Sequence, residues 1–368
     1  MRPVDESTVG SRLDPVDVAI LFAGVLIVAF FLAASFQRTW GDFVAQYVGA
    51  KLVGTPDLYH YDAVTQMELR YDDYYDSPKP FWRPPFYAAA LSPLGKLPYR
   101  QALVVWQILN LAALAGFVLL WPRDRLMALG LCLWFVPVWN NISLGQDMFL
   151  ILLFVGAAYA CWARGWPFAA GVVISLCAFK PALFLLLPVF IVSQRLWRLA
   201  AGVLTGGALL FLVSCLAAGW GWLGDYVALL KQASSLVSAD VRMANLEGIL
   251  VYAPWLGWAR VPAVLAVVIS LWAACRRIPF DLALGLTLAA GLLVSPRALL
   301  YDAVILLPVL TRLAESRVLP VLALVACGFG VGNVTFPGVE ILGQLWVVVV
   351  YIIAFRAVGR VDWRVSTF

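Results

Sequence analysis

Hydrophobic residues in this chain form long runs that short polar segments separate. The first run, 15–36, has about 22 residues and would measure about 33 Å as a helix, enough to cross the hydrocarbon core of a bilayer. Further runs occupy 101–121, 125–139, 148–163, 166–179, 181–193, 198–219, 261–275, 279–294, 303–311, 318–333 and 341–356. With the first run they predict an all-α polytopic membrane protein of about twelve transmembrane helices, folded as one domain over 1–368.

Two segments, 37–100 and 220–260, are too polar to face lipid, and we expect both to be large extracytoplasmic loops. The first loop has the spacing of a helix over 43–54, which a Gly-Thr-Pro sequence ends, and of a second short amphipathic helix over 61–75. A Pro-Pro pair at 84–85 is expected to stop regular structure before the chain re-enters the membrane. Long loops of this kind usually carry function.

Composition agrees with a membrane protein and excludes several other classes. The chain is 63% hydrophobic and 13% charged, whereas soluble globular proteins average about 25% charged residues. The net charge of +5 therefore predicts no nucleic-acid partner, because Arg and Lys in membrane proteins first report topology. The 6 cysteines lie singly in apolar runs and His60 is the 1 histidine, so we expect no metal, disulfide, redox chemistry or cofactor.

Arginines fall mainly in alternate polar segments, which the positive-inside rule makes cytoplasmic. This puts both termini in the cytoplasm and the two long loops outside, in a multi-pass protein of the inner or plasma membrane that contacts its lipids. The same bias favours a hairpin over 166–193 with Arg164 and Arg195 on the cytoplasmic side, although one long kinked helix is the alternative. Lys180 and Arg297 then remain outside, against the bias.

A few charged residues are predicted at the outer ends of helices, where topology gives no reason for them. An ionisable side chain at membrane depth costs about 2.5–3.5 kcal/mol, so each is a functional candidate. They are Asp42, Asp147, Lys180, Arg297 and Asp302. These residues come from distant parts of the sequence, yet all are predicted at the same depth, near the outer surface of the membrane. They therefore indicate a single extracytoplasmic site.

Asp42 follows the first span and is flanked by aromatic residues. Restricted access of water raises the pKa of a carboxylic acid toward a value that suits a general base. The alternative is an N-cap for the following helix, a position that Asp favours. We expect the catalytic role, since a cap alone does not explain the aromatic neighbours.

Three cations are candidates to bind a phosphate group. Lys180 lies at a tight break between two apolar helices, where the alternative is a lysine that reaches to the lipid headgroups. Arg297 is equally suited to bind phosphate or to pair with Asp302. Arg83, just before the Pro-Pro pair, is the third candidate.

Gln146 and Asp147 offer hydrogen bonds suited to sugar hydroxyls, with the alternative that they solvate a short loop. His60 is a further candidate for a substrate contact, although a lone histidine in an exposed loop is more often structural.

Short motifs recur in order along nearly the whole chain. They are Asp42-Phe43 with Tyr47, Leu58-Tyr59, Pro84-Pro85, Ser92-Pro93-Leu94, Leu97-Pro98, Gly145-Gln146, Phe179-Lys180-Pro181, Ser295-Pro296 and Tyr301-Asp302. This order resembles glycosyltransferase family 87, integral-membrane enzymes of the GT-C superfamily that are related to polyprenyl-phosphate-mannose-dependent mannosyltransferases.

The resemblance implies a GT-C-type helical bundle, a polyprenyl-phosphate-sugar donor, a lipid or glycan acceptor and an inverting transfer. Asp42 matches the acid of the first outer loop, which is the catalytic base. Lys180 matches the lysine of the Lys-Pro motif, and Tyr301 and Asp302 match the paired residues after Ser-Pro.

The chain departs from the family pattern in two places. Members often have Asn after Gly-Gln, where this chain has Asp147, and those similar to the mannosyltransferases often have histidines where it has Tyr301 and Asp302. Without a histidine there, Arg297 or Lys180 becomes the expected source of charge for the donor phosphate.

We therefore expect a membrane hexosyltransferase, with mannose as the first choice of sugar, that works outside the cytoplasm without a metal. A transporter or flippase of a lipid-linked sugar is the alternative. Transporters usually contain matched repeats, however, and the long first loop has no counterpart in the second half of the chain.

Overall fold

The fold is built from helices in the part of the chain that the computed structural model describes, residues 15–37, 41–71, 79–121, 124–236, 243–314 and 340–358. With η for a 3₁₀ helix, they are α1 (Pro15–Gln37), α2 (Phe43–Leu52), η2 (Pro56–Tyr59), α3 (Tyr61–Glu68), α4 (Pro85–Gly95), α5 (Tyr99–Leu120), α6 (Arg125–Trp134), α7 (Val136–Leu144), α8 (Met148–Ala163), α9 (Pro167–Ser175), η3 (Leu176–Phe179), η4 (Pro181–Phe184), α10 (Leu187–Ser193), α11 (Trp197–Ala218), α12 (Trp222–Leu236), α13 (Leu246–Tyr252), η5 (Pro254–Ala259), α14 (Arg260–Cys275), α15 (Phe280–Val294), η6 (Leu300–Leu306), α16 (Leu307–Ala314) and α18 (Glu340–Val358). The predicted all-α class is confirmed.

Four of the described helices are long and apolar enough to cross a membrane, and the bent pair α6–α7 makes up to 5. The four are Asp17–Gln37, Tyr99–Leu120, Trp197–Ala218 and Pro254–Cys275. The chain is therefore an integral membrane protein. Most other predicted runs are helices of 10–17 residues, and the run over 318–333 lies outside the described residues, so a count of about twelve spans is not confirmed.

Two predictions about helix ends were wrong because proline can begin a helix as well as end one. The run over 125–139 is not one helix, since the chain is extended at Phe135 and α6 and α7 meet at 65°. Pro137 lies in the first turn of α7, where its missing N–H costs nothing. Likewise Pro85 is the first residue of α4, so the Pro-Pro pair starts a helix and does not end regular structure.

The segment from α9 to α10 is a hairpin and not one long kinked helix. A β-carbon at Gly171 would collide with Leu199 O, and one at Gly206 with Ser175, so α9 and the first half of α11 run parallel in close contact. Since the segment that contains α10 connects them, this segment must run in the opposite direction to α9. Each arm is 13 residues, about 20 Å, so the hairpin is too short to cross a bilayer core of about 30 Å. The tip of the hairpin, at Lys180, therefore lies beside the middle part of α11 and not beside its end.

The core of the bundle is α15, which is buried on every side over Phe280–Leu293. A helix that is hydrophobic all round can be surrounded by lipid or by protein, and here protein surrounds it. At its end a β-carbon at Gly291 would collide with Leu183 O, so α15 lies directly against η4. The tips of two hairpins, α9–α10 and α15–α16, are thus held beside each other.

The first predicted loop is a compact helical layer. α2 ends at Leu52, shortly before Gly54 at φ 82°, as the Gly-Thr-Pro sequence predicted. α3 begins at the predicted Tyr61 but ends at Glu68, and residues 72–78 lie outside the described part. Gly95 lies so close to Ala50 that a β-carbon would touch its backbone, which packs α4 against α2.

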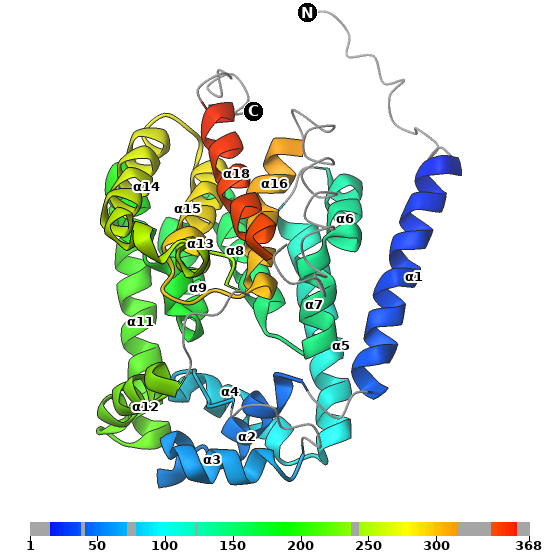
Figure 1. Cartoon of the computed structure of the whole chain (residues 1–368), viewed down its shortest axis with the longest axis vertical. Helices are drawn as coiled ribbons and strands as arrows, with labels where there is room; N and C mark the ends of the chain where they lie inside the picture. The colour runs from blue at the N-terminus through cyan, green and yellow to red at the C-terminus, as the bar shows by residue number, and fades with distance from the viewer. Residues whose placement is uncertain are drawn as a thin grey trace, which may run out of the picture.

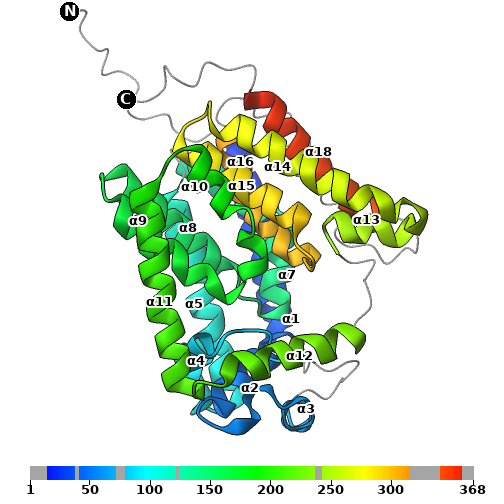
Figure 2. The same cartoon turned by 90° about the vertical axis from the view of Figure 1, so that its left-hand side faces the viewer.

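Helices α2, α3, α4 and α12 gather at one end of the molecule (Figures 1 and 2). The N-terminal end of α1 and the C-terminal end of α18 lie at the opposite end (Figure 1). Long helices such as α5 and α11 connect the two ends, whereas the short hairpins stop between them. The candidate site lies where the hairpin tips face the layer of the first loop.

Candidate active site

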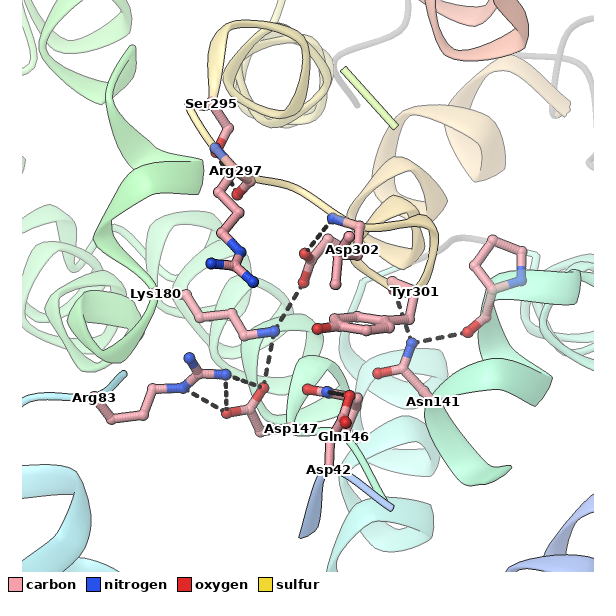
Figure 3. A network of polar contacts seen from close by, with 12 residues as sticks. Asp42, Arg83, Asn141, Gln146, Asp147, Lys180, Ser295, Arg297, Tyr301 and Asp302 are labelled. Carbon is pink, nitrogen blue, oxygen red and sulfur yellow. Dashed lines mark hydrogen bonds and ion pairs between the residues drawn. The ribbon is translucent and has the colours of Figure 1, made fainter. Parts of the chain in front are cut away.

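Polar side chains from five separate segments point toward one another between the hairpin tips and the first loop (Figure 3). The segments are the start of α2, the stretch before α4, the α7–α8 turn, the tip of α9–α10 and the connection from α15 to η6. They carry the predicted residues Asp42, Arg83, Gln146, Asp147, Lys180, Arg297, Tyr301 and Asp302. The structure brings these predicted residues together.

The α7–α8 turn fixes the start of the first loop. Gly145 ends α7 in the left-handed conformation at φ 67°, which glycine adopts without strain. Its carbonyl accepts a hydrogen bond from Trp106 Nε1 at 2.8 Å, and the Asp42 backbone N–H donates to Leu144 O at 2.9 Å. A β-carbon at Gly145 would crowd Phe43, so the turn and the loop are in direct contact.

Asp42 occupies the N-cap position of α2, but its side chain makes no capping hydrogen bond. Instead its Oδ2 accepts a hydrogen bond from Gln146 Nε2. Burial raises the pKa of the Asp42 carboxyl above its ordinary value of 3.8, an effect that Gln146 and the charges of Lys79, Lys180 and Arg83 partly offset. The alternative role as a cap is therefore absent, and the acid keeps an oxygen available for a proton.

Four charged side chains form a continuous buried cluster beside Asp42. Arg83 Nε donates to Asp147 Oδ2 at 2.9 Å and Nη2 to Oδ1 at 3.2 Å, a two-point contact. Lys180 Nζ lies 3.0 Å from Asp147 Oδ1 and 2.8 Å from Asp302 Oδ1. Burial alone would raise the pKa of Asp147, but the two cations overcome this and hold it well below its usual range.

The cluster corrects three sequence-based alternatives. Lys180 does not reach toward headgroups, because its side chain is 9% exposed and is shared by two carboxylates. Asp302 pairs with Lys180 and not with Arg297, and its second oxygen accepts from the Leu299 N–H at 2.9 Å. Asp147 does not merely solvate a loop, since its side chain is fully buried between the cations.

Arg297 differs from the other two cations. It is exposed, and within the described residues it has no carboxylate partner; its guanidinium instead lies 4.8 Å from the centre of the Trp82 ring. Two tyrosines hold the Trp82 segment, since Tyr59 OH donates to Arg83 O at 2.8 Å and Tyr226 OH to Trp82 O at 3.3 Å. Arg297 is thus held at the site without a carboxylate partner among the described residues.

Tyr301 lies over the cluster, with its ring centre 5.2 Å from Lys180 Nζ. Asn141 fixes the position of its backbone, because Nδ2 donates to Tyr301 O and Pro137 O, each at 2.8 Å. Sequence reasoning missed Asn141. The sequence signal that could have identified it is a carboxamide in an otherwise apolar stretch, a few residues before the Gly-Gln motif.

His60 does not join these residues. It is exposed at the N-cap position of α3, makes no side-chain capping bond, and is not among the residues of the network in Figure 3. Nor do the described residues include any group of three His, Cys, Asp or Glu side chains that could hold a metal ion. Positive charge at the site is supplied by Arg83, Lys180 and Arg297.

The apolar helices define an integral membrane protein. Its buried acid, which lies next to a cluster of cations, has the character of an enzyme active site. The sequence model of glycosyltransferase family 87 matches residues 81–296, more than half of the chain. The chain belongs to this family and is a membrane glycosyltransferase, which confirms the resemblance. No curated protein and no solved structure matches it.

The matched region covers part of the site. Arg83, Gln146, Asp147 and Lys180 fall inside residues 81–296. Asp42 precedes this region, and Arg297 and its neighbours follow it.

Proposed function

We propose that this protein transfers one monosaccharide, with mannose as our choice, from a polyprenyl-phosphate donor to a lipid or glycan acceptor. The transfer takes place on the extracytoplasmic side and inverts the anomeric centre. Family membership supports a transferase, and the contact of Asp42 with Gln146 beside three cations carries the assignment of the chemistry.

Asp42 is the general base of this reaction. The acceptor hydroxyl gives its proton to the carboxylate while its oxygen attacks the anomeric carbon, and the bond from that carbon to the phosphate oxygen breaks. The electron pair leaves with the lipid phosphate, and the proton stays on Asp42. The raised pKa of Asp42 makes it a stronger base than an ordinary aspartate, and Gln146 holds one of its oxygens.

Arg297 is our principal ligand for the donor phosphate. Arg83 and Lys180 are already neutralised by Asp147 and Asp302, so they leave little net charge for a further anion. Arg297 has no such partner among the described residues and lies exposed beside Trp82. Cations at a departing phosphate stabilise the charge that grows there, an effect of several kcal/mol in a water-poor site.

The orientation in the membrane follows from charge. Arginines concentrate in the segments that this proposal puts in the cytoplasm, with both termini, and the layer of α2, α3, α4 and α12 then lies outside. Within the described residues, α1 starts and α18 finishes at the same end of the molecule, as this orientation requires.

The decisive experiment is transfer from labelled polyprenyl-phosphate mannose by the purified protein in nanodiscs, compared with Asp42→Asn. Loss of the base should lower kcat by about 10²–10⁴-fold. The control is Asp57→Asn, which changes an exposed aspartate of the same loop and should keep full activity. Retained turnover in Asp42→Asn excludes the base assignment. In proteoliposomes, label that crosses the bilayer without transfer would favour the flippase.

The pH profile gives an independent check of the same residue. Asp42 acts only when it is ionised, so the rate should fall as the pH drops through its folded-state pKa. Because that pKa is raised, the fall should begin at a higher pH than the ordinary value of 3.8 predicts. A profile that stays flat down to about pH 4 contradicts the proposal.

A further inference from the structure

Three carboxamide side chains of the site region each have a buried oxygen without a donor: Gln46 Oε1, Asn141 Oδ1 and Gln146 Oε1. The side chains belong to residues that are 4%, 1% and 4% exposed, respectively. An unsatisfied buried acceptor costs about 1–3 kcal/mol, and native proteins rarely keep one without a reason. Three in one region point to a ligand that supplies the missing donors.

The direction of two of these oxygens is fixed by their own nitrogens. Asn141 Nδ2 donates to two carbonyl oxygens, and Gln146 Nε2 donates to the Asp42 carboxylate. Neither amide can be reversed, because its oxygen would then face another acceptor. Figure 3 shows that the Asn141 oxygen points toward the Gln146–Asp42 contact.

Gln46 lies one helical turn after Asp42 on α2. It follows Asp42 by four residues, and Asp42 itself has helical backbone angles of φ −76° and ψ −10°. Residues four apart share one face of a helix, and side chains lean toward its N-terminal end. The Gln46 side chain therefore leans toward Asp42.

These oxygens only accept hydrogen bonds, and no donor among the described residues reaches them. A phosphodiester has no proton to donate, so it cannot satisfy them, but the hydroxyls of a sugar can. We propose that Gln46, Asn141 and Gln146 form a polyol subsite beside Asp42. It binds a hydroxyl of the acceptor next to the one that Asp42 deprotonates, so the acceptor is a sugar or other polyol and not a simple lipid alcohol. This inference rests on the proposed function.

The test variant is Gln46→Met, which has a similar shape but no acceptor oxygen. Hexyl mannoside serves as the acceptor probe, with its monodeoxy analogues and 1-hexanol for comparison. The KM for hexyl mannoside should rise about tenfold, with kcat and the donor KM nearly unchanged. One deoxy analogue should bind wild type and variant equally, because it lacks the hydroxyl that Gln46 accepts.

The matched control is Asn110→Leu. Asn110 is also a buried carboxamide without hydrogen bonds, but it lies one turn beyond Gln107 on α5, away from the hairpin tips. Its replacement should leave the KM for hexyl mannoside unchanged. A similar rise in KM in both variants would mean a general packing effect and would overturn the subsite.

Direct binding separates this inference from the proposed function. The Kd of hexyl mannoside is measured without donor, from tryptophan fluorescence of the protein in nanodiscs. A Kd about tenfold weaker in Gln46→Met supports the subsite even if wild type transfers no sugar, in which case the proposed function alone fails. Equal Kd values for wild type and Gln46→Met would overturn the subsite. Buried water molecules would then be the donors to these oxygens.

Discussion

Two groups of buried charges lie at opposite ends of the α15–α16 hairpin. At the beginning of α15, Asp281 Oδ2 lies 2.6 Å from Arg312 Nε of α16, and the side chains are only 7% and 4% exposed. At the tip, Lys180 is shared by Asp147 and Asp302, and Arg83 pairs with the first of these.

The two groups differ in how many segments they join. The Asp281–Arg312 pair connects the two arms of one hairpin, as expected of a contact that stabilises the fold. The cluster at the tip joins four segments far apart in sequence, and Arg83 remains 16% exposed. A buried pair is only weak evidence for stability, because desolvation offsets attraction. We infer that the first group serves folding and the second serves the reaction.

Among changes to these two groups of charges, the largest expected effect is the loss of transfer in Lys180→Met. This change removes the cation that orders two carboxylates at the site, and we expect kcat to fall by about 10³-fold. Part of the damage would be structural, because Asp302 is left without a counter-ion. Transfer assays and the Tm of the purified protein measure the two effects separately.

The double variant Lys180→Met/Asp302→Asn separates charge balance from chemistry. It removes one charge of each sign and keeps an oxygen that can accept from the Leu299 N–H. The Tm should recover, whereas transfer should stay low. If transfer recovers as well, Lys180 is only a counter-ion, and the contrast with the Asp281–Arg312 pair disappears.

The second prediction concerns that pair. Arg312→Met leaves a buried carboxylate unpaired and should lower the free energy of unfolding by about 3–5 kcal/mol. Asp281→Leu/Arg312→Leu should regain most of the loss, and folded double variant should transfer sugar at the wild-type kcat. Thermal unfolding and transfer per folded molecule are the measurements. A low kcat in the stable double variant would assign this end of the hairpin a part in the reaction.

The sequence predicted the all-α class, many of the helices and most of the residues that meet at the candidate site, but not how these residues pair. α8 has the bounds of its apolar run, and the hairpin at Lys180 follows from the distribution of arginines. Runs of apolar residues are local, so they can be read directly. The Asp42–Gln146 contact joins residues 104 apart, and it depends on how the α7–α8 turn packs against the first loop.

Sequence proximity did not identify the partner of Asp302. A pair with Arg297 was one of two alternatives, but the carboxylate of Asp302 contacts Lys180 and the Leu299 N–H instead. Asn141 was missed for a related reason. Its value comes from holding the Tyr301 backbone across 160 residues, which no local pattern contains.

The smallest expected effect is that of Arg297→Gln. Arg297 is exposed and has no carboxylate partner in the described part of the chain, so its loss should leave the Tm unchanged. The KM for polyprenyl-phosphate mannose should rise about tenfold, and the difference from wild type should shrink in high salt, which screens exposed charges. Arg260→Gln is the matched control, because Arg260 is also exposed but pairs with Glu247 at 2.7 Å. Equal donor KM values for wild type and Arg297→Gln would mean that Arg297 does not bind the donor phosphate. The paired cations Arg83 and Lys180 would then be its ligands, and the cluster would both hold the site together and bind the donor.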